Sequence, residues 1–140
     1  MTAGAETAAG GGDYDWDALR SLAIEVAKTA YCPYSRLQVG VTAVVDDGRI
    51  ITGCNVENAS YGLGLCAECT LVGQLMLTGG GRLVALACRS GEGELLMPCG
   101  RCRQVIYEHG GPDLLVDTPA GVKPMTWVLP EAFGPEFLPA

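Results

Sequence analysis

Hydrophobic residues recur along this chain with two periods, one helical and one typical of strands. Between positions 15 and 31, six apolar residues fall three or four positions apart: Leu19, Leu22, Ala23, Val26, Ala27 and Ala30. This spacing predicts a helix over 15–31 with one apolar face. Asp13 or Asp15 is suited to cap its start, and Pro33 stops it soon after its end.

Two β-branched runs follow, over 39–45 and 49–56, and Asp47-Gly48 lies between them. An Asp-Gly step between such runs predicts an antiparallel hairpin. Residues 55–65 are rich in Asn, Ser, Gly and Tyr and are expected to form a loop.

The second half of the chain alternates between helices and strands. Helices are predicted over 66–78, before Gly79-Gly80-Gly81, and over 99–109, before Gly110-Gly111. Strands are predicted over 82–89, 114–118 and 122–128. Gly73 disfavours the first of these helices by roughly 1 kcal/mol relative to alanine, and a close neighbour would explain it. This order predicts an α/β fold in which helices cover the faces of a sheet.

The length, charge and cysteine content of the chain indicate how many domains, which partners and which compartment to expect. A chain of 140 residues is expected to form one domain, over 14–140, behind a disordered Ala/Gly/Thr-rich tail over 1–13. The net charge of −7 argues against a nucleic-acid polymer as partner. No apolar run approaches the roughly 20 residues of a membrane span, and the tail does not resemble a signal peptide. Seven cysteines without a secretion signal indicate a reducing compartment, the cytoplasm.

Two short cysteine pairs carry the candidate chemistry: Cys66 with Cys69, and Cys99 with Cys102. Cys66, Cys99 and Cys102 fall at predicted helix starts, where the helix dipole favours thiolate, the form that binds zinc. Three sulfurs would leave the fourth tetrahedral position of Zn²⁺ to a water molecule. Glu68 then has a chemical task, because a carboxylate beside that water can carry its protons.

The same cysteines permit two other interpretations. Including Cys69, the pattern is C-x₂-C…C-x₂-C, which is also typical of a closed, four-cysteine structural zinc site. A helix and a strand separate the pairs, unlike the short loops of a zinc ribbon, and a structural site gives Glu68 no role. A disulfide framework is the third interpretation, and the absence of a secretion signal argues against it.

With the segments CAE (66–68) and PCGRC (98–102), the chain resembles the zinc-dependent nucleoside and nucleobase deaminases. Further segments resemble the small homotetrameric cytidine deaminases, most closely the actinobacterial, mycobacterium-like members. These segments are AYCPYS (30–35), GCNVENASYG (53–62), CRQV (102–105) and LPEAF (129–133). The resemblance runs from about residue 16 to 138. It implies a three-layer α/β/α sandwich with a mixed sheet of about five strands.

The resemblance also implies a role for each site residue. It implies that Cys66, Cys99 and Cys102 hold one Zn²⁺ per subunit and that Glu68 is the catalytic acid and base. For the substrate, it implies that Asn55 and Glu57 bind the ribose hydroxyls. It implies that the backbone N–H of Ala67 binds the base carbonyl and that Leu37 lies near the base. Tyr61 and Phe133 are implied to reach into the site of a neighbouring subunit. Asn55 and Glu57 are two positions apart at a strand end, so their side chains point the same way. Taken alone, both are better interpreted as loop polar residues, and the zinc motif beside them reverses this preference.

Two positions depart from the family pattern. Many relatives have arginine after the catalytic glutamate, where it offsets the charge of the thiolates, and Cys69 stands there in this chain. We expect helix N-termini, with Arg101, Arg103 or Gln104, to compensate. Leu37 stands where the family usually has phenylalanine, so it can pack on a pyrimidine without aromatic stacking.

The predicted reaction is the hydrolytic deamination of cytidine and 2′-deoxycytidine to uridine and 2′-deoxyuridine, with release of ammonia, in pyrimidine salvage. The alternatives are a deaminase of a related nucleoside such as blasticidin S, and a non-catalytic four-cysteine zinc-binding module. The expected partners are a small pyrimidine nucleoside and three further copies of the chain, with sites shared between subunits. Neither a nucleic-acid polymer nor a membrane is expected to be a partner.

Overall fold

A computed structural model describes residues 13–140, so the predicted disordered tail over 1–13 lies outside the described residues except for Asp13. The first helix, α1 (Trp16–Ala27), is capped at its N-terminus by Asp15, whose carboxylate accepts a hydrogen bond from the Ala18 N–H at 3.1 Å. It ends at Ala27, four residues earlier than predicted. The reason is that Tyr31 forms a β-bridge with Val56, so the chain must leave the helix before it.

A five-stranded sheet forms the centre of the fold. Its strands are β1 (Val39–Val45), β2 (Ile50–Cys54), β3 (Leu83–Ser90), β4 (Leu115–Thr118) and β5 (Gly121–Pro124), and their order in the sheet is β2-β1-β3-β4-β5. β3 and β4 are parallel, and the other neighbours are antiparallel. The predicted hairpin is confirmed, with Val44 opposite Ile50 and Gly48 at φ 94° in its turn.

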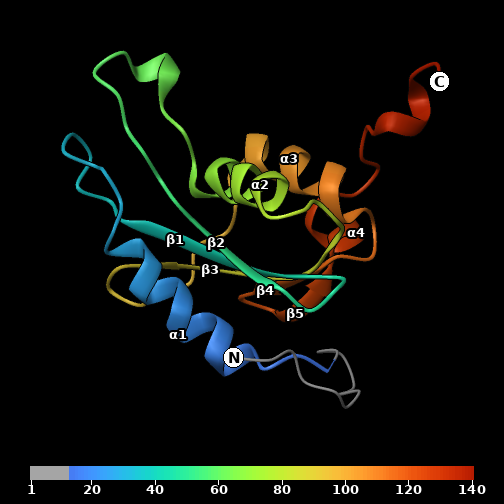
Figure 1. Ribbon diagram of the computed structural model, residues 1–140, viewed down its shortest axis with the longest axis horizontal. Coiled ribbons are helices and arrows are strands. Elements are labelled where there is room, and N and C mark those ends of the chain that lie inside the picture. Colours follow the sequence, from blue (N-terminus) through green and yellow to red (C-terminus); the bar gives the residue numbers. More distant parts are fainter. Residues whose placement is uncertain (1–12) are drawn as a thin grey trace.

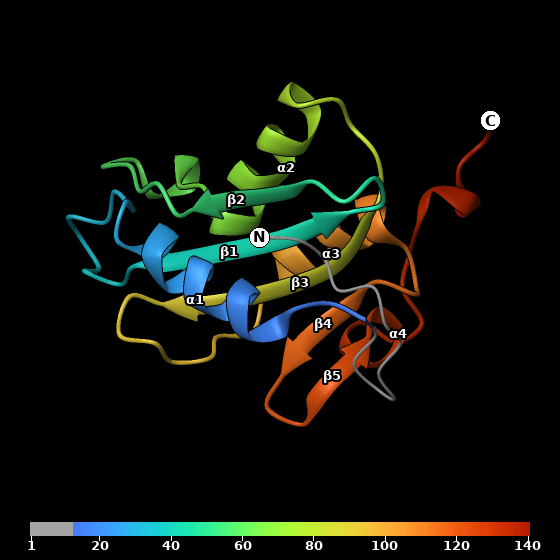
Figure 2. The ribbon, with the colours of Figure 1, turned by 60° about the horizontal axis from the view of Figure 1, so that its bottom comes forward.

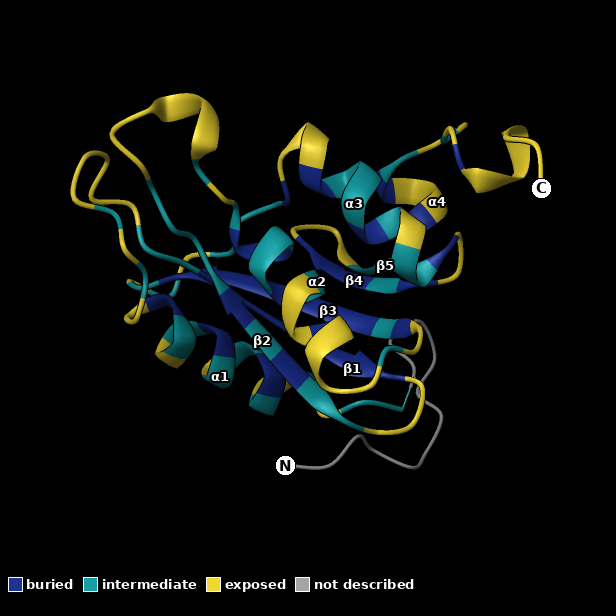
Figure 3. Ribbon diagram, turned by 45° about the horizontal axis from the view of Figure 1, so that its top comes forward, coloured by how far each residue is buried: buried dark blue, intermediate teal, exposed yellow. Residues whose placement is uncertain are grey.

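Helices cover both faces of this sheet (Figure 1). α1 lies on one face, and α2 (Ala67–Leu77) and α3 (Gly100–Gly110) lie on the other, as Figure 2 also shows. The expected three-layer α/β/α sandwich with a mixed five-stranded sheet is therefore confirmed. Two short 3₁₀ turns, at Tyr61–Leu63 and Pro135–Phe137, lie in mostly exposed segments (Figure 3).

The predicted strand over 122–128 is wrong in its second half. β5 ends at Pro124, and a short helix, α4 (Met125–Val128), follows. Proline has no N–H with which to continue a ladder, and it forms the N-cap of α4. The next residue, Met125, is fully buried and donates its N–H to the Leu114 carbonyl at 2.8 Å, which turns the chain inward.

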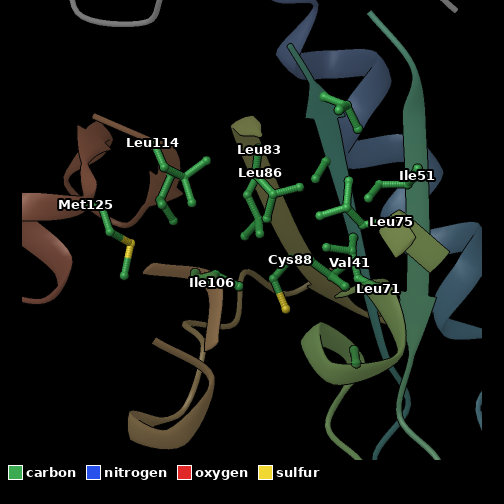
Figure 4. Packing of buried hydrophobic residues seen from close by; sticks show 14 of the residues in the cluster. Val41, Ile51, Leu71, Leu75, Leu83, Leu86, Cys88, Ile106, Leu114 and Met125 are labelled. Carbon is green, nitrogen blue, oxygen red and sulfur yellow. The ribbon is translucent and has the colours of Figure 1, made fainter. Parts of the chain in front are cut away.

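The main hydrophobic core lies between the sheet and the layer of α2 and α3 (Figure 4). Val41 and Leu86 of the sheet, Leu71 of α2 and Ile106 of α3 are all fully buried in it. Cys88 is also in this core, as expected of a cysteine that acts as a small hydrophobic residue. A smaller cluster under α1 contains Leu19 and Val44.

Two glycines let helices approach the sheet more closely than a side chain would allow. A Cβ at Gly53 of β2 would lie 2.3 Å from the carbonyl oxygen of Ala67, the first residue of α2. A Cβ at Gly40 would lie 2.1 Å from the carbonyl oxygen of Ala23 in α1. The Thr70 hydroxyl also hydrogen-bonds the Cys54 N–H and carbonyl, at 3.0 and 2.8 Å. The start of α2 is thereby fixed against the end of β2.

Gly73 does not follow this rule. Within the described residues, nothing lies within 4 Å of a Cβ built there, so the expected close neighbour is not found.

A charged cluster ties α1 to the sheet. The buried Asp117 of β4 accepts hydrogen bonds from Arg89 of β3 at 2.6 Å and from the Nε of Arg20 in α1 at 3.0 Å. Burial by itself would raise the pKa of Asp117, but the two guanidinium groups outweigh it and hold this pKa below its ordinary value. The ionised carboxylate is thus the form that the fold stabilises.

We predict that Gly53→Ala destabilises the protein by about 1–3 kcal/mol, because the added methyl group collides with backbone atoms of α2. Gly73→Ala, in the helix against which Gly53 packs, is the control, because nothing lies near a Cβ built there. It is expected to stabilise by up to about 1 kcal/mol, because alanine favours a helix. Urea unfolding of the three proteins gives the comparison, and a loss for Gly53→Ala no larger than the change for Gly73→Ala would contradict the close-packing argument.

We predict that Asp117→Asn costs about 2–4 kcal/mol at pH 7, somewhat less than a fully enclosed ion pair because Arg20 is one-third exposed. Because the folded-state pKa of Asp117 is lowered, its contribution is present above about pH 4 and is lost as the pH falls through the folded value. The free energy of unfolding should therefore depend less on pH below about pH 4 in the variant. An unchanged acid dependence would argue against this assignment.

Candidate zinc centre and active site

Three cysteine sulfurs meet where the N-termini of α2 and α3 lie close together. Cys66 is the N-cap of α2, Cys99 is the N-cap of α3, and Cys102 lies in the first turn of α3. The Cys66 thiol makes no capping hydrogen bond, so it remains available to bind another group. The partial positive charge of the two helix ends favours sulfur in its thiolate form.

The spacing of these sulfurs fits a zinc ion. The three Sγ atoms lie within 4.8 Å of one another, and those of Cys66 and Cys99 are 3.8 Å apart. Two sulfurs bound tetrahedrally at the usual Zn–S length of 2.3 Å are about 3.8 Å apart. The donor set therefore fits Zn²⁺ in distance and in chemistry.

Cys69 is not part of this group. In the described part of the chain, the side chains that come together as candidate metal ligands are Cys66, Cys99 and Cys102. The closed four-cysteine site is therefore not what the structure presents. All seven cysteines are free thiols, which also counts against a disulfide framework.

Glu68, in the first turn of α2, is the buried carboxylate beside the three sulfurs, and only 3% of it is exposed. Burial raises the pKa of Glu68, although hydrogen bonds from its own N–H and from the Cys102 thiol act in the opposite direction. A carboxyl group whose pKa is raised holds a proton more readily than a free one, which suits a general acid and base.

The thiols titrate differently from one another. Burial raises the pKa of Cys66 and of Cys102, and the charge of Glu68 contributes further at Cys102. The pKa of Cys99 is lowered: burial opposes this shift, but hydrogen bonds, first from the Cys102 N–H, outweigh it. A divalent cation among the three sulfurs supplies the charge that favours thiolate at all of them.

Arg101 is the side chain that partly neutralises the excess negative charge of this cluster. Three thiolates and one Zn²⁺ sum to −3 + 2 = −1, and Cys69 adds no positive charge. The Nη2 of Arg101 lies 3.7 Å from the Cys66 sulfur, and this contact raises the pKa of Arg101. Of the other two candidates, Arg103 binds the Pro98 and Val128 carbonyls and Gln104 binds the Phe133 carbonyl.

A pocket of about 590 Å³ opens from the cluster. This volume is in the usual range for a site that encloses a small molecule. Most of the predicted site residues line it: Leu37, Asn55, Glu57, Tyr61, Cys66, Ala67, Glu68 and Cys99. Two further apolar side chains, Leu96 and Met97, also line it, and no sequence motif marks them.

Asn55 and Glu57 use much of their hydrogen-bonding capacity within the protein. The Asn55 side chain accepts from the Val39 N–H and donates to the Leu37 carbonyl, both at 2.8 Å. Glu57 accepts from the N–H groups of Tyr34 and Ser35 and from the Ser35 hydroxyl. Both side chains still line the pocket. Ser35 was missed in the sequence, because a serine in an irregular loop carries no periodic signal.

Two predicted site residues are strongly exposed. Tyr61, on the first 3₁₀ turn, is 82% exposed and lies at the pocket. Phe133 is 57% exposed, stacks on Phe137 with ring centres 5.6 Å apart, and is not among the residues that line this pocket. Within one copy of the chain, Phe133 and the cysteine cluster are therefore not brought together.

Comparison with known proteins agrees with this geometry. The family model described as "Cytidine and deoxycytidylate deaminase zinc-binding region" matches residues 15–118, so the chain belongs to that family. A cytidine deaminase of Mycobacterium tuberculosis is 60% identical over 127 residues, which cover 91% of this chain and 96% of the relative.

Solved structures give the same result. The crystal structure of cytidine deaminase from Mycobacterium tuberculosis is similar with a TM-score of 0.85 and 61% identity, covering 87% of this chain and 99% of that one. For cytidine deaminase from Mycobacterium leprae, the TM-score is 0.83 and the identity 57%, covering 85% of this chain and 100% of that one.

We predict that Arg101→Gln weakens zinc binding about three- to tenfold, because the charge beside Cys66 is lost while the three ligands remain. Competition with a chromophoric chelator measures the affinity. The effect should shrink as salt is raised, since Arg101 is fully exposed and its charge is screened. Lys28→Gln, which removes an equal charge at the exposed end of α1, is the control. Equal zinc affinities for the two variants would exclude the role given to Arg101.

Proposed function

We propose that this chain catalyses the hydrolytic deamination of cytidine and 2′-deoxycytidine, giving uridine and 2′-deoxyuridine with release of ammonia, in pyrimidine salvage. The observation that carries the proposal is the buried Glu68 beside three zinc-compatible sulfurs, in the lining of a pocket that Asn55 and Glu57 also line. The relatives named cytidine deaminase support the same substrate.

Glu68 is proposed as the proton carrier of the reaction. When bound by Cys66, Cys99 and Cys102, zinc supplies a Lewis acid that makes water nucleophilic near neutral pH. Glu68 takes one proton from the attacking water and delivers it to the ring nitrogen, and then takes the second proton from the hydroxyl group on carbon 4 and delivers it to the leaving amine. The water oxygen ends on carbon 4 of the pyrimidine and the amine leaves as ammonia, so Glu68 returns to its starting state.

The base is proposed to bind between the start of α2 and Leu37. Ala67 is the first residue of α2, and the first N–H groups of a helix have no partner within it. Its N–H is therefore available to donate to the carbonyl of the base. Leu37 is half-exposed at the pocket and offers an apolar surface to one face of the ring.

The sugar is proposed to bind at Asn55 and Glu57. After its bonds to Val39 and Leu37, Asn55 keeps one N–H and one lone pair, so it can still donate and accept. Glu57 is a carboxylate and can only accept, which suits a sugar hydroxyl as donor.

We further propose a homotetramer with sites shared between subunits. Its support is the exposure of Tyr61 and Phe133, two large aromatic side chains that are costly to leave in water. In this arrangement each subunit binds one zinc ion, and residues 14–140 act as one catalytic domain.

The proposed place of action is the cytoplasm, because three zinc-binding thiols and four further free thiols persist in a reducing compartment. Along residues 13–140, no helix has the length and apolar character needed to cross a membrane. The acidic net charge of −7 argues against a nucleic-acid polymer as substrate.

We predict that Glu68→Gln lowers kcat for cytidine by at least about 10²–10⁴-fold while one zinc per chain is retained, because the amide cannot carry protons. Ammonia release and metal content are measured on the same sample, with cytidine, 2′-deoxycytidine, blasticidin S and adenosine as substrates. A zinc-loaded wild-type protein that releases ammonia from none of them would be a binding module. Release from blasticidin S in place of cytidine would change the proposed substrate.

A further inference from the structure

The loop over residues 31–39 is fastened to the end of β2 by backbone and side-chain hydrogen bonds. The Tyr31 N–H donates to the Asn55 carbonyl at 3.1 Å, and the Glu57 N–H donates to the Tyr31 carbonyl at 2.8 Å. The side chains of Asn55 and Glu57 bind the same loop further on, at Val39 and at Ser35. The two residues proposed to bind the sugar are thus positioned by this loop.

Glu57 has one acceptor site left after these bonds. Its Oε1 accepts from the Tyr34 N–H at 3.0 Å and the Ser35 N–H at 3.1 Å. Its Oε2 accepts a short hydrogen bond from the Ser35 hydroxyl. A carboxylate offers about four lone-pair sites, two on each oxygen, so one site on Oε2 remains. The remaining acceptor site is thus on Oε2 of Glu57, the same oxygen that accepts the hydrogen bond from Ser35.

The hydroxyl of Ser35 is held in this direction by the next part of the loop. The Leu37 N–H donates to the Ser35 oxygen at 3.0 Å, and the Leu37 carbonyl accepts from the Asn55 side chain at 2.8 Å. The Ser35 oxygen accepts this hydrogen bond from the Leu37 N–H, while the Ser35 O–H donates to Glu57. Arg36, between them, has φ 63°, a left-handed conformation that a non-glycine residue adopts only when its surroundings fix it.

We propose that Ser35 is a positioning residue, which fixes the carboxylate of Glu57 for a sugar hydroxyl and so makes the pocket selective for nucleosides that carry one. This inference rests on the proposed function and names what selects the substrate at that site. Ser35 lines the pocket together with Glu57 and Asn55. Its hydroxyl is committed within the protein, so it acts through Glu57.

The charge of Glu57 gives this selectivity its chemical basis. The pKa of Glu57 is lowered, and the hydrogen bond from Ser35 is the largest cause. An ionised carboxylate that is short of one donor is satisfied by an O–H group and not by a C–H group. A site built to hydrogen-bond a hydroxyl rejects the analogue that lacks it, because its own polar groups are then left unpaired.

The test compares cytidine with 2′,3′-dideoxycytidine, whose sugar ring carries no hydroxyl. For Ser35→Ala we expect kcat/KM for cytidine to fall roughly tenfold, as for a charge-assisted hydrogen bond in water. The kcat/KM for 2′,3′-dideoxycytidine should change by no more than about twofold. The preference for cytidine, measured as the ratio of the two kcat/KM values, should therefore fall roughly tenfold. Dissociation constants of uridine and 2′,3′-dideoxyuridine provide the same ratio without turnover.

Two further variants separate positioning from mere support of the loop. Ser35→Thr keeps the hydroxyl and should restore most of the ratio, whereas Ser21→Ala removes an exposed serine of α1, on the opposite face of the sheet, and should change nothing. An equal loss on both nucleosides, or no loss on either, would overturn the proposal. Failure of the proposed function is a different result, since the wild-type protein with zinc bound would then release no ammonia from cytidine.

Discussion

The constraint on which the rest of the site depends is the meeting of two helix N-termini at three sulfur atoms. α2 and α3 must both begin at the same edge of the sheet, and each does so for a local reason. α2 is held against β2 by the absence of a side chain at Gly53 and by the hydrogen bonds of Thr70. α3 is the crossover helix between β3 and β4, the parallel pair of the sheet, and a right-handed crossover determines on which face it lies.

The same arrangement determines how the negative charge of the sulfurs and of Glu68 is balanced. A cluster of three sulfurs and a buried carboxylate would be repulsive without a cation. The raised pKa of Cys102 reflects burial first and then the charge of Glu68, whereas the raised pKa of Glu68 reflects burial. Zinc, two helix ends and one exposed guanidinium supply the opposite charge from three different distances. Because Arg101 lies at the surface, its share depends on salt, whereas the share of the helix ends is built into the fold.

The elements with strong local signals were predictable from the sequence, and the others were not. The Asp47-Gly48 hairpin and the two helices that begin at cysteines were found because a turn signal or a terminal glycine run marks their ends. The end of α1 was misplaced, and α4 was predicted as part of a strand, because both depend on contacts distant in sequence: Tyr31 with Val56, and Met125 with Leu114. The three-sulfur cluster was visible as a motif, but the exclusion of Cys69 from it required the fold.

The residues that line the pocket come from two parts of the chain, which are held in place in different ways. The half at α2 and α3 rests on regular elements, so its residues can be read from spacing along the chain. The half at residues 31–39 and the end of β2 has no repeating pattern, and its order comes from side chains that bind backbone groups. Such a loop has few ways to bend without breaking these bonds. Leu37, Asn55 and Glu57 share one hydrogen-bonded unit, so one irregular loop positions both the residue proposed to lie near the base and the residues proposed to bind the sugar.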